Sequence, residues 1–518
     1  MSRTRSSIYI LFSLLCLVNV SLCADILMIS PLPSVSHSLW NQKLANLIVT
    51  ETNHHVTIVD VFHQMIKHPK ITHIELGNPI EYGELDLSYF TKYQTGKQSL
   101  DLLNEWIDLS TKNLINMPKT KQFLDEYKGK KFDLIIFDGG CCEAFLGFVD
   151  VFGAPPLIIA TAFGSASFLM DYAGNYDNPS YVAGSMSPYI APMNFMERLE
   201  NTLVYIYFNY LHHYKSLNNA DKLAKEFFGN EISNVRDIAS RAVVTLINYH
   251  PTLDGVKPLL PSIVSIGGFH IEPTKPLETE LQKFLDNSKN GVIYVSFGSN
   301  LKCTKMDEDK FNIFVQAFKE LKQNVVWKCE KSIPNQPKNI FLGKWFNQSD
   351  ILAHPNVKVF ISHGGLLGTQ EAVYHGVPVL VFPFVIDQHI NAKRLEKMGV
   401  AIPMSYMDVT VSGLKKSINT LLTDPSFRET MKARSAAFRD NPISPRNLTL
   451  FWIEYVLRHP NTDLLRSATQ EMSIFQILLL DVIIFLVSIV LTILIVFIYL
   501  IRKILNIFRK TKPKKKTS

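Results

Sequence analysis

A His-Gly-Gly tripeptide at 363–365 has the residue types and spacing of an anion site. It separates an apolar, β-branched run, 357–362, from a helix-compatible segment, 366–375, and a second apolar run follows at 379–382. This order predicts a strand, a glycine turn, a helix and a second strand, which is the βαβ unit of a parallel sheet. The first N–H groups of such a helix have no partner within the helix, and the helix dipole favours negative charge there. The tripeptide therefore predicts a site for a phosphate group.

A histidine and an aspartate elsewhere in the chain could act together as a general base. His37 follows a predicted strand, 25–30, and Asp138 follows another, 132–137. Because parallel strands present their carboxyl ends at one edge of the sheet, we expect both side chains at that edge. The carboxylate would orient the imidazole and stabilise its protonated form. Spacing alone supports the pair weakly, since the chain has 15 histidines.

The glycine pattern excludes two common kinds of phosphate site and matches a third. The run Gly-Gly-Leu-Leu-Gly, 364–368, lacks the G-x-G-x-x-G spacing of a dinucleotide site, and the Gly-Lys-Ser/Thr of a P-loop does not follow it. The segment 357–391 instead resembles the signature of the UDP-glycosyltransferases. The residues that carry the resemblance are His363, Gly364, Gly365, Glu371, Gly376, Val377, Pro378, Pro383, Asp387, Gln388 and Asn391.

The resemblance covers essentially the whole body of the chain, and it implies a fold and a set of roles. The implied fold is α/β with the GT-B architecture, in which two Rossmann-like domains face a cleft. The implied catalytic residues are His37, in a Ser-His context, and Asp138, after a Phe-Asp strand. The implied donor residues are Ser299, facing the diphosphate; Trp345 and Gln348, holding the uracil; His363 with the N–H groups after Gly364 and Gly365, binding the diphosphate; Glu371, accepting from the ribose hydroxyls; and Asp387 and Gln388, contacting the sugar.

One position departs from the family pattern. Leu367 stands where many relatives have asparagine, so one polar contact to the phosphates is missing or is supplied by the backbone. We expect no cofactor and no metal, because the implied fold stabilises the leaving diphosphate without metal and the sequence has no compact cluster of metal ligands. The UDP-sugar itself enters as a co-substrate.

The implied reaction is a direct displacement with inversion. His37 takes a proton from an acceptor hydroxyl as the hydroxyl attacks the anomeric carbon, and UDP leaves toward the glycine turn. The resemblance to invertebrate members favours UDP-glucose over UDP-glucuronic acid. A different class of function is the alternative, a membrane-anchored lumenal binding or carrier protein that has lost catalysis. The presence of His37, Asp138 and the donor residues in one chain argues against that alternative.

An aromatic-rich region between 157 and 257 predicts the acceptor pocket. Two helices are expected there, 195–217 and 218–228, and apolar walls would suit a small lipophilic alcohol or phenol, as in detoxification. Large apolar residues at helical spacing are also common in plain protein cores, so the sequence singles out no residue of this region. The acceptor's identity stays open.

Two α/β domains must position these residues. An N-terminal, acceptor-binding Rossmann-like domain is expected over 24–260, and a proline-rich linker over 261–290. A C-terminal, UDP-sugar-binding Rossmann-like domain is expected over 291–458, with strands at 291–296 and 325–329. By family analogy, its final helix packs back on the N-terminal domain.

Both ends of the chain predict targeting to a membrane. Residues 1–23 have the basic start, apolar core and small-residue end of a cleaved secretory signal. After a juxtamembrane segment, 459–476, a transmembrane helix is expected over 477–501, which includes twenty consecutive residues without a charge. The tail, 502–518, has eight basic and no acidic residues, which predicts a cytoplasmic tail and a lumenal body.

The tail also bears on localisation and on partners. Lys515 and Lys516 resemble the dilysine signal that returns membrane proteins to the endoplasmic reticulum, and a polybasic, lipid-facing tail is the alternative. The formal net charge of +7 comes from the tail and the signal, because the body between them is slightly acidic. Nucleic acid is therefore not expected as a partner. The sequence leaves homo-oligomerisation open.

Four cysteines and two glycosylation sequons complete the chemical inventory. The cysteines outside the predicted signal are Cys141, Cys142, Cys303 and Cys329. An oxidising compartment permits a disulfide among them, although adjacent Cys141 and Cys142 are expected to be packed or free thiols. Of the sequons at Asn347 and Asn447, only Asn447 is expected to carry a glycan, because Asn347 lies inside the predicted donor motif.

Overall fold

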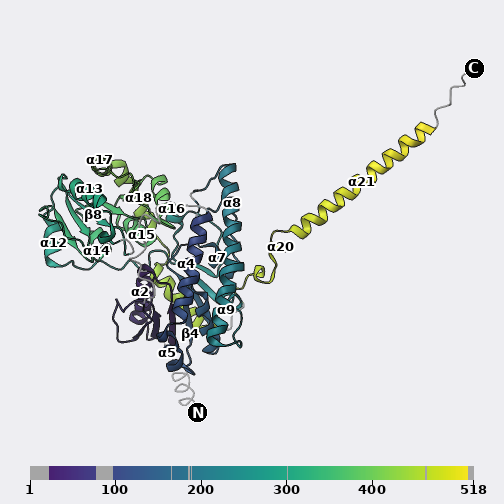
Figure 1. Ribbon diagram of the computed structural model, residues 1–518, viewed down its shortest axis with the longest axis horizontal. Coiled ribbons are helices and arrows are strands. Elements are labelled where there is room, and N and C mark those ends of the chain that lie inside the picture. The colour runs from purple at the N-terminus through teal and green to yellow at the C-terminus, as the bar shows by residue number, and fades with distance from the viewer. Residues whose placement is uncertain are drawn as a thin grey trace, which may run out of the picture. The chain divides into compact units, whose positions relative to one another are not determined.

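Runs of apolar and β-branched residues form the strands of two parallel sheets (Figure 1). The computed structural model describes residues 23–77, 97–164, 166–184, 187, 189–299, 302–460 and 464–510. The predicted secretory signal, except for Cys23, and the dilysine at 515–516 lie outside the described residues. The chain separates into a unit that ends at Arg466 and a second unit that begins at Ser467.

The described part of the N-terminal sheet has seven strands in the order β3-β2-β1-β4-β5-β6-β7. All neighbouring strands are parallel. They are β1 (Asp25–Ser30), β2 (His55–Asp60), β3 (Ile71–Glu75), β4 (Leu134–Asp138), β5 (Leu157–Thr161), β6 (Ala242–Ile247) and β7 (Ile263–Ser265). The central strands are continuous apolar runs, as expected for a parallel sheet that is covered on both faces.

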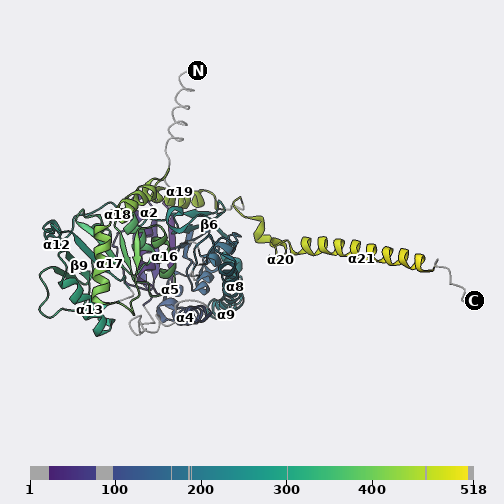
Figure 2. The ribbon, with the colours of Figure 1, turned by 90° about the horizontal axis from the view of Figure 1, so that it is seen from above.

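Alternate residues of these strands pack on opposite faces of the sheet. In β1, Leu27 belongs to an apolar cluster on one face, which includes residues of the helices between β3 and β6. Ile26 belongs to the cluster on the other face, with residues of α2 (Val35–Glu51) and α19 (Pro445–Arg458). The chain's α19 therefore packs on the N-terminal sheet, where it also contacts α2 and β6 (Figure 2).

The remaining helices of the N-terminal half cover the first of these faces or join the strands. They are α4 (Lys97–Ile115), α5 (Pro118–Tyr127), the 3-10 turn η1 (Glu143–Leu146), α6 (Gly147–Val151), α7 (Ser167–Tyr172), α8 (Phe195–Tyr210), the π-helical turn η2 (Leu211–Ser216), α9 (Leu217–Phe228), α10 (Val235–Ala239) and α11 (Pro251–Asp254). The sequence predicted two helices meeting near Leu217. The structure instead has α8, η2 and α9 in direct succession, because no glycine or proline interrupts 195–228.

The described part of the C-terminal sheet has six parallel strands in the order β10-β9-β8-β11-β12-β13. They are β8 (Val292–Ser296), β9 (Asn324–Lys328), β10 (Ile340–Gly343), β11 (Val357–Ser362), β12 (Val379–Val381) and β13 (Ala401–Pro403). One face packs against α13 (Glu308–Lys319) and α17 (Val411–Thr423). The other packs against α12 (Thr279–Asp286), α14 (Gln348–Ala353), α15 (Leu366–His375), α16 (Gln388–Lys397) and α18 (Pro425–Arg439).

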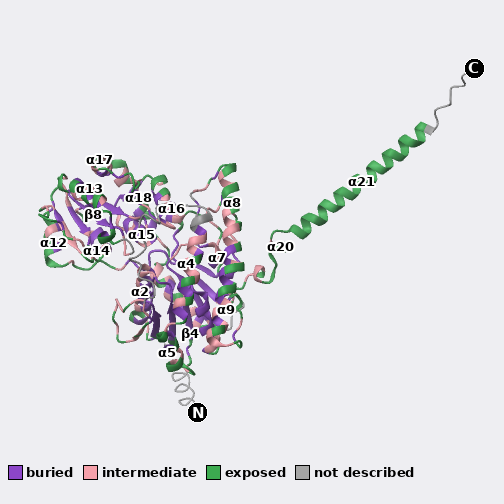
Figure 3. Ribbon diagram, viewed as in Figure 1, coloured by how far each residue is buried: buried purple, intermediate pink, exposed green. Residues whose placement is uncertain are grey.

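Burial follows this layering in both halves (Figure 3). Most strands are buried, the edge strands β3 and β10 are largely half-buried or exposed, and the outward faces of the surrounding helices are exposed. Two Rossmann-like α/β halves, each with a parallel sheet covered by helices on both faces, confirm the predicted fold class.

The second unit is described to residue 510 and contains one long apolar helix. A short helix, α20 (Ile474–Ile477), precedes α21 (Leu480–Lys510), and Leu479 between them has a positive φ of 53°. The most apolar 18-residue window of the span 480–509 has a mean hydropathy of 3.2, and none of this window is buried, which fits a membrane anchor. The helix begins three residues later than the predicted 477 and continues past 501, because no glycine or proline ends it there.

Candidate active site

Several of the predicted site residues follow the strands at which the order of each sheet reverses, whereas Trp345 follows β10 and Asp387 follows β12. In the N-terminal sheet the reversal lies between β1 and β4, and in the C-terminal sheet it lies between β8 and β11. Connections that leave two such neighbouring strands go to opposite faces of the sheet, which opens a crevice at the carboxyl edge. His37 follows β1 and Asp138 ends β4, whereas Ser299 follows β8 and His363 follows β11.

His37 and Asp138 form a buried pair at the first crevice. His37 lies in the first turn of α2, and its Nδ1 is 3.3 Å from Asp138 Oδ2. Asn41, one helical turn after His37, donates from Nδ2 to the same Oδ2 at 2.9 Å and to Ser30 Oγ at 2.9 Å. The Phe163 ring packs edge-on against the imidazole, with centroids 4.4 Å apart. With Nδ1 facing the carboxylate, Nε2 is the nitrogen that can reach a substrate hydroxyl.

Asn41 is a hydrogen-bond partner of the pair that sequence reasoning missed. It holds the Asp138 carboxylate in place from the same helix that carries His37. The signal in the sequence was its i+4 spacing from His37, which puts both side chains on one helix face.

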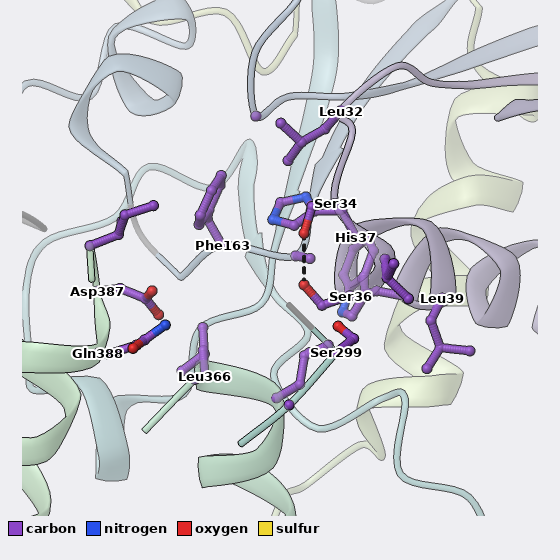
Figure 4. A pocket seen from close by; sticks show the side chains of 18 of the residues that line it. Leu32, Ser34, Ser36, His37, Leu39, Phe163, Ser299, Leu366, Asp387 and Gln388 are labelled. Atoms are coloured by element: carbon purple, nitrogen blue, oxygen red, sulfur yellow. Dashed lines mark hydrogen bonds between the residues drawn. The ribbon is translucent and has the colours of Figure 1, made fainter. Parts of the chain in front are cut away.

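The start of α2 has no side-chain cap. The Ser34 hydroxyl contacts the Ser36 hydroxyl at 3.0 Å instead of a helix N–H group (Figure 4).

Gly298 and Gly365 pack closely against the His363 ring and form a narrow slot for it. A Cβ placed on Gly298 would lie 2.6 Å from His363 Cε1, and one on Gly365 would lie 2.5 Å from His363 Nε2. Gly364, which joins His363 to Gly365, has a φ of +82°, and a Cβ there would lie 2.8 Å from a Val381 methyl group. Burial, with a smaller contribution from the Lys328 charge, lowers the pKa of His363 to about 4. The imidazole is therefore neutral at physiological pH and can donate one hydrogen bond toward the start of α15.

Trp345, Gln348 and Glu371 line one cavity with His363. The Trp345 side chain is 56% exposed, so a ring face is open to stacking. Gln348 Nε2, at the start of α14, donates to Glu371 Oε2 at 2.5 Å. Burial raises the pKa of Glu371, and this hydrogen bond and the Lys43 charge oppose that effect.

Two lysines at this crevice were missed by sequence reasoning. Lys328, the last residue of β9, lies over the Trp345 ring with Nζ 4.2 Å from its centroid, and it donates to the Gly298 carbonyl at 2.8 Å. Burial lowers the pKa of Lys328 to about 8. Lys43 of α2 reaches the same cavity from the N-terminal half and donates to the His270 carbonyl at 2.8 Å. Neither lysine belongs to a recognisable motif, so only its position in the fold reveals it.

Asp387 and Gln388 lie at the start of α16 and face His37 across the cavity (Figure 4). Gln388 Oε1 accepts from the N–H groups of Phe384 at 2.8 Å and Val385 at 3.1 Å, which leaves its amide N–H groups for a ligand. Asn391 donates to Asp387 Oδ2 at 2.9 Å. Burial raises the pKa of Asp387, an effect that the Asn391 hydrogen bond and the charge of His37 oppose.

One cavity of about 1740 Å³ joins the residues of both halves. The predicted site residues that line it are His37, Ser299, Trp345, Gln348, His363, Gly365, Glu371, Asp387 and Gln388. Asp138 and Gly364 do not line the cavity. Asp138 contacts the lining residue His37, and Gly364 lies in the turn beside Val381. Gln370 of α15 donates to the Asn248 carbonyl at 3.1 Å and so ties the two halves together beside the cavity.

The sequence comparisons agree with this geometry. The family model described as UDP-glucoronosyl and UDP-glucosyl transferase matches residues 44–517. The chain belongs to this family. A protein named UDP-glucosyltransferase 2, from Dactylopius coccus, is 34% identical over 495 residues, which is 93% of each chain. UDP-glucuronosyltransferase 2B15 of Homo sapiens is 31% identical over 433 residues, or 83% of this chain and 79% of the human one.

Solved structures show the same GT-B fold. The complex of Medicago truncatula UGT71G1 with UDP-glucose aligns with a TM-score of 0.55 at 16% identity, over 85% of this chain and 99% of that one. A UDP-glucosyltransferase from Polygonum tinctorium aligns with a TM-score of 0.54 at 15% identity, over 85% and 99%. The predicted GT-B architecture is thereby confirmed, and the chain is a UDP-glycosyltransferase.

A disulfide between Cys303 and Cys329 borders the donor side of this UDP-glycosyltransferase. It connects the short turn η3 (Cys303–Lys305) to the residue after Lys328. Cys141 and Cys142 are buried free thiols with their sulfur atoms 3.0 Å apart. The structure thus selects one pairing among the cysteines that the sequence left open.

Leu367 has a packing role in the UDP-glycosyltransferase. It is half-buried against the apolar cluster that α2 and α19 form with the N-terminal sheet, and it also lines the cavity. An apolar residue at this position therefore joins the two halves. Among the described residues no group of three or more histidine, cysteine, aspartate or glutamate side chains could hold a metal ion, and the expectation of metal-independent chemistry stays a prediction.

Proposed function

We propose that this UDP-glycosyltransferase transfers the hexose of UDP-glucose to a hydroxyl group of a small lipophilic acceptor, with inversion at the anomeric carbon. The observation that carries the proposal is the His37–Asp138 pair, which opens into the same cavity as the donor-motif residues. A base, its orienting carboxylate and a phosphate-binding helix start around one cavity are the parts that a direct displacement requires.

In the proposed reaction, His37 Nε2 takes the proton of the acceptor hydroxyl as its oxygen attacks the anomeric carbon. The bond between that carbon and the β-phosphate oxygen breaks, and UDP leaves with the electron pair. Asp138 stabilises the imidazolium that forms on His37. The N–H groups at the start of α15, together with His363 and Ser299, take up the charge of the diphosphate.

The remaining donor contacts are proposed by position. Trp345 stacks on the uracil while Gln348 bonds to its edge, and Glu371 accepts from the ribose hydroxyls. Asp387 and the free amide N–H groups of Gln388 bind the hexose hydroxyls. The backbone at Leu367 supplies the phosphate contact that an asparagine side chain would make. Asn347 stays unglycosylated, since it lines the same cavity.

Two relatives bear on the donor. The one with 34% identity is named a glucosyltransferase and the one with 31% is named a glucuronosyltransferase, which favours UDP-glucose.

The deciding experiment incubates microsomes that contain the full chain with UDP-glucose and, separately, with UDP-glucuronic acid, across a panel of phenols and steroids. Conjugates are then identified by mass. Hexose addition from UDP-glucose supports the proposal. Addition from UDP-glucuronic acid alone would overturn the choice of donor, and UDP binding without transfer from either would point to a binding protein.

We also propose that α21 anchors the chain in the endoplasmic reticulum membrane, with the body lumenal and the tail cytoplasmic. The apolar, exposed helix and the basic residues after 501 support this orientation. Asn447 is exposed and provides the test. A glycan on Asn447 that endoglycosidase removes, and that disappears in Asn447→Gln, places the body in the lumen. Cleavage of the body by protease added to sealed microsomes would refute the orientation.

A further inference from the structure

Part of the cavity wall in the N-terminal half is polar, although it is set among aromatic residues. Phe168 and Phe208 line the cavity there, with ring centroids 5.8 Å apart. Glu143 and His212 line it at the same place, and the His212 ring is 4.7 Å from that of Phe168. Both polar side chains are buried, and neither takes part in the proposed transfer.

The fold places these polar residues by unusual backbone. Glu143 starts η1, directly after Cys142, which has a left-handed φ of 63°. His212 lies in the π-helical turn η2 between α8 and α9. Single π-helical turns between α-helices are rare and are frequently found at functional sites. The turn brings His212 and Ser216 to the cavity.

Tyr172, at the end of α7, connects the two. Its hydroxyl oxygen is 2.9 Å from His212 Nε2, and the same hydroxyl is hydrogen-bonded to the Glu143 side chain. Burial lowers the pKa of His212 well below its usual value, so the ring is neutral and can donate from Nε2 to the tyrosine oxygen. The tyrosine then donates to Glu143.

Glu143 keeps acceptor capacity that faces the cavity. A carboxyl group offers about four acceptor positions, and Tyr172 and the backbone N–H of Glu143 itself occupy two of them. Burial, with a smaller contribution from Asp108, raises the pKa of Glu143 to about 7. A buried carboxyl group in an aromatic wall is unfavourable unless it is hydrogen-bonded. A ligand that donates a hydrogen bond to Glu143 would therefore be favoured over one that does not.

The same segment of chain runs from the base to this polar wall. Asp138 holds His37, and a Cβ on Gly140 would lie 3.4 Å from His37 Cε1. Glu143 follows three residues later. An acceptor whose reacting hydroxyl lies at His37 can thus extend along this segment toward Glu143.

We propose that Glu143, oriented by Tyr172 and His212, is a second recognition point for the acceptor, and that it binds a hydroxyl or amine group at the far end of a lipophilic phenol. This inference rests on the proposed function, because it names the acceptor class for transfer at His37. Asp138 and His37 decide whether transfer occurs, and Glu143 decides which acceptors are transferred to efficiently.

The test compares three acceptors that differ only in the group at their far end, on the full-length enzyme in microsomes and with each of the two donors. They are 4-butylphenol, 4-(4-hydroxybutyl)phenol and 4-(4-aminobutyl)phenol. We expect kcat/KM to be roughly tenfold or more higher for at least one polar-ended phenol than for 4-butylphenol, because a site built for a hydrogen bond discriminates against an analogue that lacks it. The two polar-ended acceptors show whether a hydroxyl or an amine is preferred.

Two variants assign the preference to Glu143. Glu143→Leu should abolish it and should raise kcat/KM for 4-butylphenol, and Tyr172→Phe should weaken it in the same direction. UDP affinity, which depends on the other half, shows that the donor site is intact, and retained transfer to 4-butylphenol shows that the N-terminal half is folded. Equal loss on all three acceptors, with UDP affinity retained, would show a merely structural role and overturn the inference.

The wild-type comparison needs no substitution and separates the two ways to fail. Transfer to all three phenols without preference for a polar end would overturn this inference and leave the proposed function standing. Transfer to steroids of the panel but to none of the phenols would overturn this inference alone. Absence of transfer from either donor to every phenol and steroid of the panel would overturn the proposed function, and this inference with it.

Discussion

The two halves have their predicted site residues at the same topological position, but one half uses a pair of side chains and the other uses closely approaching backbone. In the N-terminal half, the loops after β1 and β4 supply a side-chain pair, His37 and Asp138, joined at 3.3 Å. In the C-terminal half, the loops after β8 and β11 supply a glycine slot, in which Gly298 and Gly365 leave room for the His363 ring. A proton transfer needs a titratable side chain, whereas a diphosphate is held by N–H groups that only close backbone approach can offer.

This difference predicts a division of kinetic effects. Substitutions in the N-terminal pair should lower kcat and leave donor binding nearly unchanged, since the donor contacts lie on the other sheet. Substitutions in the C-terminal crevice should act mainly on the KM for the donor. Effects that cross this boundary would show that the cavity works as one unit.

The largest expected effect is that of His37→Ala. Loss of the general base should lower kcat by about 10²–10⁴-fold at saturating donor, because the acceptor hydroxyl then attacks without proton removal. UDP affinity should stay within about twofold, since donor binding uses the other sheet. His55→Ala, which replaces an exposed histidine of the same half, is the control. Wild-type rates in His37→Ala would remove the base from the mechanism.

Asp138→Asn should have a smaller effect of the same kind. The amide keeps the shape of the side chain but loses the charge that stabilises the imidazolium, a charge-assisted hydrogen bond worth about 1.5–3 kcal/mol, or roughly 10- to 150-fold in kcat. Steady-state kinetics at saturating donor measure it. A rise in donor KM in place of a fall in kcat would contradict the division between the halves.

Trp345→Ala should act on the donor side. Stacking on a base contributes about 1–3 kcal/mol, and the lower end is expected for a ring that is 56% exposed, so donor KM should rise roughly five- to tenfold. The kcat at saturating donor should change little. Phe451→Ala removes a comparably exposed aromatic ring of α19 and serves as the control. An unchanged donor KM would move the uracil away from Trp345.

The smallest effect expected is a pH dependence of donor binding. Burial lowers the pKa of Lys328 to about 8, so its ammonium is charged below that pH and loses its charge above it. Donor affinity should therefore fall as pH rises through about 8, by a few-fold for a charge contribution of about 1 kcal/mol. Lys328→Arg keeps its charge throughout this range and should flatten the profile. The same slope in both proteins would assign it to another group.

The C-terminal site could be predicted more fully from sequence than the N-terminal one. Strand β11 and helix α15 have the predicted bounds, 357–362 and 366–375, because a short β-branched run, a glycine turn and a helix are local features. The His37–Asp138 pair is separated by 101 residues in the chain and gives no local pattern. It was identified through family resemblance, and its third member, Asn41, was not identified.

Other residues were beyond the reach of local patterns for related reasons. Lys328 matters because β9 ends beside the glycine slot, and a lysine at a strand end is not unusual in itself. The Cys303–Cys329 pairing depends on the adjacency of β8 and β9, which no spacing rule specifies. The π-helical turn at 211–216 has helix-compatible residues throughout, so the sequence predicts helix and not the shift in side-chain direction.

The amino-acid sequence by itself determined the α/β class, the donor motif, the family and the apolar C-terminal segment. The class and the apolar segment depend on periodicity and composition, which act over a few residues at a time, and the donor motif and the family depend on resemblance to a known signature. The tertiary structure alone decided which side chains meet across the cavity: Asn41 with Asp138, Lys328 with Trp345, and Tyr172 with His212. Such contacts arise from sheet order and from the packing of separate segments, and neither is encoded in the neighbourhood of a single residue.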